Sequence, residues 1–267
     1  MKKFTYFSSE FVSPGHPDKV SDQISDAILD ACLADDPNSR VACEVFCTTG
    51  LVVVGGEITT TTYIDVQEIV RKKIEEIGYR PGMGFDSNCG TLSCIHSQSP
   101  DIAMGVDVGG AGDQGIMFGG AVKETEELMP LALVLSREIL VRLTKMMKAG
   151  EIAWARPDQK SQVTLAYDEN GNIDHVDSIV VSVQHDEEVS HTEIEKTIIE
   201  NIKKNRKGKT NIIVAHRISA VRHADKIVVL DNGKILNFGT HDELLEKCPW
   251  YKQLDEYQNK EVEDDEE

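Results

Sequence analysis

Apolar residues recur every three or four positions along three stretches of the chain. This spacing predicts amphipathic helices over residues 17–36, 66–77 and 130–148. The first stretch opens with Pro17 and Asp18, which suit the first turn of a helix and its positive N-terminal end. Each predicted helix therefore has one face for a core and one for solvent.

Apolar and polar residues alternate elsewhere, which predicts strands. After a strand-like opening at residues 4–12, residues 41–47 and 51–58 form one predicted hairpin, and 161–167 and 179–185 form another. Helices and hairpins mix without strict βαβ alternation. This order favours an α+β fold over a doubly wound parallel sheet.

Two segments depart from this regular pattern. Residues 99–120 carry seven glycines, which predicts a mobile loop. After about residue 200 the pattern restarts with strand-like NIIVAH, a hairpin turning at residues 231–233, and a helix capped by Thr240 with Glu243 three positions later. The acidic segment 251–267 is expected to be a disordered tail.

The chain has 267 residues and a net charge of -18, which argues against nucleic-acid binding. No apolar run reaches the length of a membrane helix, and the N-terminal residues lack the apolar core of a signal peptide. We therefore expect a cytoplasmic protein without membrane contact. The six cysteines show no metal-binding spacing, so reduced, packed thiols are expected.

The distribution of charge changes near residue 200. Residues 1–200 hold 16 basic and 33 acidic residues, whereas residues 203–234 hold nine basic and two acidic ones. A shift of this kind often marks a domain boundary, so we place one near residue 200.

Three apparent nucleotide motifs fail on their context. Residues 110–115 match a dinucleotide-binding fingerprint but do not open a helix, and residues 208–210 resemble the end of a phosphate loop whose first glycine is replaced by Lys203. The segment IVVLD at 227–231 imitates a metal-binding strand end, but its aspartate starts a hairpin turn.

Several carboxylates stand out, each with an ordinary alternative. Asp18 lies where a loop meets a helix N-terminus, so it could meet a phosphate or its metal. Glu44 and Glu57 lie on adjoining strands of an apolar hairpin, but both could simply face water. Asp158 and Lys160 could be a surface ion pair. The acidic stripe that continues Asp18 along its helix is best read as solvated.

Seven ordered blocks of the chain resemble S-adenosylmethionine synthetase (methionine adenosyltransferase). They are GHPDK at 15–19, ACE at 42–44, VVGGEITT at 53–60, QSPDIAMGVD at 98–107, GAGDQGIMFG at 110–119, RPDQKSQV at 156–163 and VSVQHDEE at 181–188. The resemblance covers about residues 3–195. It implies a reaction of ATP with L-methionine that yields S-adenosylmethionine, phosphate and pyrophosphate, in a homo-oligomer that uses Mg²⁺ and K⁺.

The resemblance also implies roles for individual residues. His16 and Lys160 are the expected catalytic pair, which contacts the polyphosphate or the leaving oxygen. Asp18 is the expected Mg²⁺ ligand and Glu44 belongs to the expected K⁺ site. The expected substrate-binding residues, which contact methionine or adenosine, are Glu57, Gln98, Asp113 and Asp158. Residues 99–112 would be the gating loop, shorter than is usual in the family.

Residues from about 197 to 250 do not continue this family, whose third region is absent from the chain. They resemble the end of an ABC-transporter ATPase domain, most clearly in KGKTNIIVAHRISAVRHADKIVVLDNGKILNFGTHDELL. His216 matches that family's switch histidine. Because the phosphate loop and signature motif are absent, we expect His216 to be an exposed strand-end residue, and an ABC-type ATPase is rejected.

The sequence therefore predicts four regions and a chimera of two unrelated coding sequences joined within 191–200. The regions are an N-terminal one at 1–103, a gating loop and central region at 104–195, a partial α/β ATPase fragment at 196–250 and the acidic tail at 251–267. Two functions compete: an adenosyltransferase of weak or no activity alone, and a non-catalytic module that binds ATP or methionine.

Overall fold

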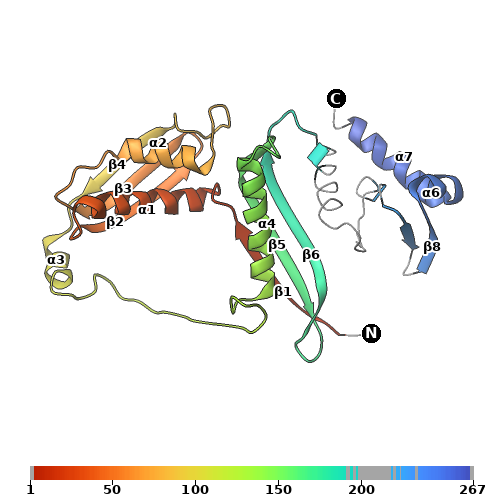
Figure 1. The fold of residues 1–267 in the computed structure, drawn as a ribbon, viewed down its shortest axis with the longest axis horizontal. Coiled ribbons are helices and arrows are strands. Elements are labelled where there is room, and N and C mark those ends of the chain that lie inside the picture. Colours follow the sequence, from red (N-terminus) through yellow and green to blue (C-terminus); the bar gives the residue numbers. More distant parts are fainter. Residues whose placement is uncertain are drawn as a thin grey trace. The chain divides into compact units, whose positions relative to one another are not determined.

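The computed structural model describes residues 3–190, 193–194, 197, 218, 221–222, 224–231 and 234–264, with side chains described to residue 258. The chain divides into two compact units, residues 1–186 and 187–267. We describe each unit by itself, with its elements labelled in Figure 1.

The first sheet of unit 1 is antiparallel and joins the N-terminus to the middle of the chain. It contains β1 (Thr5–Val12), β5 (Ala155–Tyr167) and β6 (Ile173–His185), in the order β1-β5-β6. Helix α4 (Leu131–Lys148) packs on β1 and β5, as Figure 1 shows. The buried side chains between them belong to Ala132, Val163 and Leu165.

The second sheet of unit 1 contains β2 (Arg40–Thr48), β3 (Leu51–Thr59) and β4 (Gly90–His96). Strands β2 and β3 form the predicted antiparallel hairpin, and β4, which the hydrophobic pattern did not reveal, adds in parallel. Helices α1 (Pro17–Asp35) and α2 (Val66–Ile77) cover one face of this sheet. Among the described elements of unit 1, no helix covers the other face (Figure 1).

The helix ends follow from local chemistry that the sequence already carries. The side chain of Asp65 accepts a hydrogen bond from the backbone N–H of Glu68 and so caps α2. Gly78 ends that helix with φ 119°, a conformation that glycine adopts without steric penalty. Helix α1 buries Val20, Ile24 and Ile28, the positions that its periodicity predicted.

Strand β5 is longer than the sequence predicted. It begins at Ala155 rather than near residue 161, so Asp158 and Lys160 lie within the strand and not in the loop before it. Beyond the first residue, the buried positions in this part of β5 are Pro157, Gln159 and Ser161, so it lacks the run of buried apolar residues that reveals a strand in a sequence.

The glycine-rich segment also differs from its prediction. A short helix, α3 (Pro100–Val106), occupies part of the expected loop, and residues 110–122 then run without helix or strand and are exposed. In the part of the chain that the structure describes, no helix is long and apolar enough to cross a membrane.

Unit 2 contains the predicted hairpin, β7 (Ile227–Asp231) and β8 (Lys234–Gly239), and the helix α6 (His241–Lys247). The capping box of Thr240 and Glu243 is confirmed, with hydrogen bonds in both directions. Among the described residues of unit 2, the buried apolar side chains belong to Ile218, Ile227, Val229, Leu244, Cys248 and Tyr251.

The prediction of a disordered tail over residues 251–267 is wrong for residues 251–264, which belong to helix α7 (Pro249–Asp264). Tyr251 is buried and Leu254, three positions later, packs against the same core, so one face of the helix is anchored. High charge alone did not exclude a helix here. The strand-like NIIVAH and His216 lie outside the described residues.

Candidate functional site

The loop between β1 and α1 lies against strand β5. Ser13 is fully buried there, its Oγ donates a hydrogen bond to the carbonyl of Pro157 at 2.6 Å, and it accepts one from the backbone N–H of Gln159 at 2.8 Å. The Ser13 N–H in turn donates to the carbonyl of Gln159 at 2.9 Å. The loop that carries His16 and Asp18 is therefore fixed beside the strand that carries Asp158 and Lys160.

Asp158 and Lys160 are two positions apart in β5, so both side chains point to the same face of the sheet. The described contacts include no ion pair between them, so the simple surface pair considered from the sequence does not form. Nε of Arg156 bonds Asp186 at 2.9 Å and ties the start of β5 to the residue that follows β6.

The carboxyl of Asp158 is half-buried, and its Oδ1 has no hydrogen-bond partner among the described residues. Burial raises the pKa of Asp158 above its ordinary value, and the nearby His16 and Lys160 oppose that shift. A charged group held in this way is a candidate for function, because ordinary folding would favour a paired or solvated carboxyl.

Asp18 lies in the first turn of α1 and keeps its carboxylate open to solvent, with 84% of the side chain exposed. The neighbouring Lys19 bonds Asp22 instead, at 2.7 Å, and leaves Asp18 only the Nδ1 of His16, 3.7 Å away. One free carboxylate at a helix N-terminus fits a Mg²⁺ whose other ligands are phosphate oxygens and water. Among the described residues, no group of three metal-binding side chains gathers.

A cavity of about 240 Å³ lies next to these residues. The aromatic rings of Tyr79 and Phe85 meet edge to face there, with centroids 5.0 Å apart. The cavity is lined by Gly15, Pro17, Val20, Cys47, Thr48, Thr49, Tyr79, Phe85, Asp158 and Gln184. Its lining includes both polar and apolar side chains, which suits a small ligand with both characters.

Glu44, Glu57 and Gln98 form a second group, at the sheet of β2, β3 and β4. Glu44 lies directly opposite Gly55 in the ladder, so the two share a face of the sheet. Glu57 is two positions after Gly55 on β3 and lies on that same face, which is the one that α1 and α2 leave uncovered. Gln98 follows the end of β4, where its N–H donates to the hydroxyl of Thr59. The group offers negative charge on an open surface and does not form a closed ion site.

Asp113 lies apart from both groups. It is exposed in the segment after α3, and its described hydrogen bond is to the adjacent N–H of Gln114. The apolar side chains of Ile116, Met117 and Phe118 in the same segment are at least 84% exposed. Such an exposed apolar run is typical of a surface that another chain or a ligand covers.

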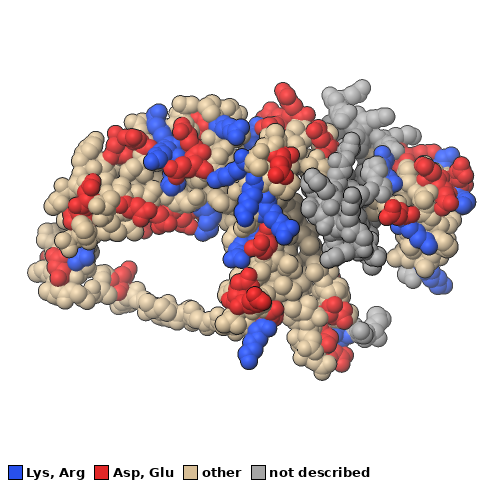
Figure 2. Space-filling model, in the orientation of Figure 1, with Lys and Arg blue, Asp and Glu red and all other residues tan. Residues whose placement is uncertain are grey.

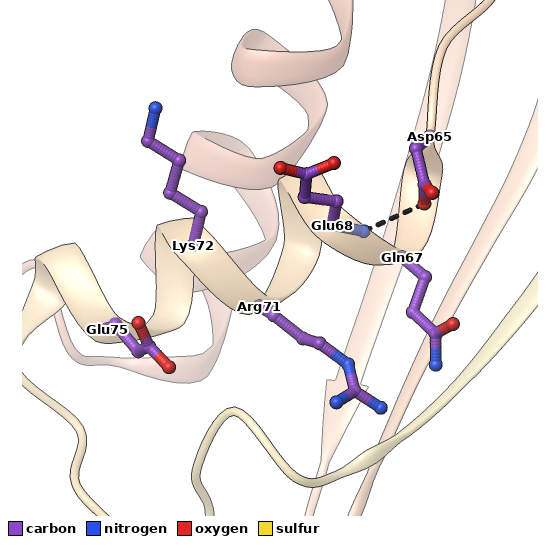
Figure 3. A pocket seen from close by; sticks show the side chains of 6 residues that line it. All are labelled: Asp65, Gln67, Glu68, Arg71, Lys72 and Glu75. Carbon is purple, nitrogen blue, oxygen red and sulfur yellow. Dashed lines mark hydrogen bonds between the residues drawn. The ribbon is translucent and has the colours of Figure 1, made fainter.

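Two charged surfaces lie outside these groups. Figure 2 shows a band of carboxylates along α1, where Asp22, Asp26 and Asp30 are exposed, as the solvated reading predicted. Figure 3 shows a hollow on α2 lined by Asp65, Gln67, Glu68, Arg71, Lys72 and Glu75. None of the residues singled out from the sequence lines this hollow, and its side chains carry both signs of charge.

Comparison with known proteins identifies the two folded regions of unit 1. The family model of the S-adenosylmethionine synthetase N-terminal domain matches residues 4–100, and that of the S-adenosylmethionine synthetase central domain matches residues 108–230. The chain belongs to the S-adenosylmethionine synthetase family. The resemblance seen in the seven sequence blocks is thereby confirmed at the level of the family.

An S-adenosylmethionine synthase from Fusobacterium nucleatum subsp. nucleatum is 87% identical over 204 residues. The match covers 76% of this chain and 53% of that protein, so the chain spans about half the length of this curated relative. The comparisons give no support to the ABC-ATPase resemblance of residues 197–250. The central-domain match of the synthetase family instead extends to residue 230.

Sequence reasoning missed two residues that hold the candidate site in place. Ser13 makes buried hydrogen bonds to the backbone on either side of Asp158, and Tyr79 makes one to the carbonyl of Gly15, before His16. Neither residue belongs to a motif that chemistry alone marks. Their partners lie far away in the sequence, so only the folded chain reveals them.

The unfavourable environment of Asp158 predicts that this carboxylate lowers stability. Its pKa is raised on folding, so its ionisation destabilises the folded chain as pH rises through that raised pKa. We expect Asp158→Asn to raise the melting temperature at pH 7 by a few degrees, and the gain to disappear as pH falls toward the ordinary pKa of Asp. Differential scanning calorimetry across this pH range measures it.

Asp36→Asn is the matched control, with the opposite sign. Hydrogen bonds from Thr61 lower the pKa of Asp36, so its ionised form stabilises the fold and its loss should lower the melting temperature at pH 7. A lower melting temperature for Asp158→Asn at pH 7 would show that Asp158 stabilises the fold instead.

Proposed function

We propose that residues 1–195 form part of a methionine adenosyltransferase site, which joins ATP and L-methionine to give S-adenosylmethionine, phosphate and pyrophosphate. The observation that carries this proposal is the juxtaposition of the β1–α1 loop and β5. It brings His16 and Lys160 to one half-buried carboxylate, Asp158. The Fusobacterium relative is named for the same product.

Opposite electrostatic demands explain why the site needs both signs of charge. The neutral sulfur of methionine becomes a cation when it attacks the ribose C5′, so carboxylates near it stabilise the developing charge. The departing tripolyphosphate requires cations. We propose that His16 and Lys160 serve the polyphosphate as the catalytic pair, and that Glu57, Gln98, Asp113 and Asp158 contact methionine or adenosine.

Asp18 and Glu44 are the proposed metal ligands, for Mg²⁺ and K⁺ respectively. Bound Mg²⁺ would neutralise charge between this acidic chain and the polyphosphate. The exposed Asp18 carboxylate fits that role, and Glu44 offers a single carboxylate for K⁺ on the open sheet face. We propose a cytoplasmic location, without nucleic-acid or membrane partners.

The proposed boundaries follow the sequence regions, 1–103 and 104–195, with one qualification. Strand β1, from the start of the chain, pairs with β5 of the central region, so the two regions share a sheet.

A non-catalytic module that binds ATP or methionine is the second candidate. It is favoured by the partial coverage of the family, because the chain spans 53% of the length of the Fusobacterium relative.

We predict that the 267-residue chain on its own shows no more than trace adenosyl transfer. Loss of one preorganised electrostatic group typically lowers a rate ~100 to 1,000-fold, and the third region of the family would supply several such groups. A radiolabelled-methionine assay with ATP, Mg²⁺ and K⁺ measures the rate. Turnover of about 1 per second, lost in Lys160→Ala, would contradict the prediction.

The same samples separate the two candidate functions. Methionine, ATP and Mg²⁺ should raise the melting temperature if the ligand surface is present, whether or not turnover occurs. Lys123→Ala is the matched control for Lys160→Ala, because Lys123 lies outside the proposed site. An unchanged melting temperature with all ligands would contradict both candidates.

We also propose that residues 196–250 are an ABC-ATPase fragment joined to the synthetase regions within 191–200, with His216 as its switch histidine, not functional here. The 87% identical match to the Fusobacterium relative covers 76% of the chain, so about a quarter of the chain lies outside it. The basic composition of residues 203–234 also differs from that of the preceding acidic chain.

Sequencing single, uninterrupted DNA molecules across codons 185 to 215 tests the join. We expect one continuous reading frame through the junction. Molecules that end or diverge there would show that the two segments are not encoded together.

We predict that the chain forms homo-oligomers. Strand β6 exposes apolar side chains on both faces, with Val176, Ile179 and Val180 at 44%, 54% and 56% exposure. Surfaces of this kind are stabilised when a second copy covers them. Light scattering at several concentrations should give a mass above that of one chain, and substitution of Ile179 by Lys should lower it. A monomer at every concentration would refute the prediction.

A further inference from the structure

Two buried hydroxyl groups hold the His16 loop against β5. The first is that of Ser13, which has no exposed surface and uses both its donor and its acceptor capacity on the backbone of Pro157 and Gln159. Ser13 thus bonds the residues on either side of Asp158, and its described hydrogen bonds do not include the Asp158 carboxyl.

The second hydroxyl belongs to Tyr79, which is 6% exposed and comes from the segment after α2. It donates a hydrogen bond of 2.5 Å to the carbonyl of Gly15, the residue before His16. The ring of Tyr79 is fixed by its edge-to-face contact with Phe85. Since ring and hydroxyl are both buried, this bond is sheltered from competition by water.

Gly15 allows the loop to approach β5 this closely. A Cβ atom at this position would lie 2.3 Å from the backbone carbon of Pro157 and 2.4 Å from its Cβ, which no packing tolerates. The close approach therefore requires glycine. The Tyr79 hydroxyl bonds the carbonyl of Gly15, and the Ser13 hydroxyl bonds the carbonyl of Pro157.

We propose that Ser13 and Tyr79 are positioning residues, whose hydroxyls set the separation between the His16–Asp18 loop and the Asp158–Lys160 strand. This inference rests on the proposed function, because it assigns the spacing of the polyphosphate-binding groups to two hydroxyls whose described hydrogen bonds are to the backbone. Misplacement of reacting groups by about 1 Å can lower a rate ~100-fold. The separation between the loop and the strand therefore has a large effect on the rate.

A purely structural role of Tyr79 would change the loop and the interior of α1 equally, whereas a positioning role would change the loop alone. The core of the β2–β3–β4 layer is formed by α1, α2 and the sheet, and the Tyr79 hydroxyl adds one hydrogen bond at its margin. Removal of that hydroxyl should loosen the loop and leave the interior of α1 and the separate Glu57–Gln98 surface unchanged.

The test uses Tyr79→Phe in the full chain, with Tyr63→Phe as the matched control, because Tyr63 is 87% exposed. Amide hydrogen exchange by NMR reports the loop through the N–H of His16, which bonds the carbonyl of Ser13. Loss of one buried hydrogen bond should speed exchange at His16 by roughly five-fold, with less than about two-fold change at Ile28 in α1. Equal changes at both sites, or none at His16, would overturn the proposal.

Calorimetric titration with MgATP and with L-methionine provides the second readout. Tyr79→Phe should weaken MgATP binding by about five-fold or more and leave methionine binding within about two-fold. Faster exchange with unchanged MgATP affinity would overturn the positioning role. If the unaltered chain binds neither ligand, the proposed function fails, and exchange alone then decides whether the two hydroxyls set the loop.

Ser13→Ala and Gly15→Ala extend the test from the other two contacts. Ser13→Ala should act in the same direction as Tyr79→Phe, and Gly15→Ala should have the larger effect because its Cβ forces the loop away from Pro157. Gly120→Ala is the control, since a Cβ there meets no atom within 4 Å. If Ser13→Ala does not fold, Tyr79→Phe still decides the outcome.

Discussion

The antiparallel pairing of β1 with β5 is the interaction on which the rest of unit 1 depends. It aligns Val12 with Lys160, and the chain then leaves the sheet through the buried Ser13. The register brings the loop of His16 to the level of Asp158, although the two lie far apart in the sequence. A slip by one residue would turn Lys160 toward α4 and separate the charged groups.

The carboxylates of unit 1 lie in two kinds of environment, and Asp158 of the proposed site differs from the others. The chain is strongly acidic, and its carboxylates on α1 are solvated, so they need no partner. Asp158 is different because burial works against its charge, which only His16 and Lys160 offset. The fold thus tolerates an unfavourable carboxylate where a histidine and a lysine lie nearby.

The two sheets of unit 1 expose their candidate groups in different ways. The His16, Asp158 and Lys160 group is fixed by backbone contacts inside the chain, whereas Glu44 and Glu57 stand on an open sheet face. Asp113 lies in an exposed segment with apolar neighbours. A site made from all of them requires contacts beyond those that one chain makes, in agreement with the proposed oligomer.

The sequence by itself determined the local elements and the family. Periodicity placed α1, α2 and α4, turn residues placed the hairpins, and Thr240 with Glu243 fixed the start of α6, because each depends on neighbours a few positions away. Tertiary structure alone decided the parallel addition of β4, the early start of β5 and the anchoring of α7. It also decided the contacts of Ser13 and Tyr79, since these depend on partners that the sequence places far apart and only packing brings together.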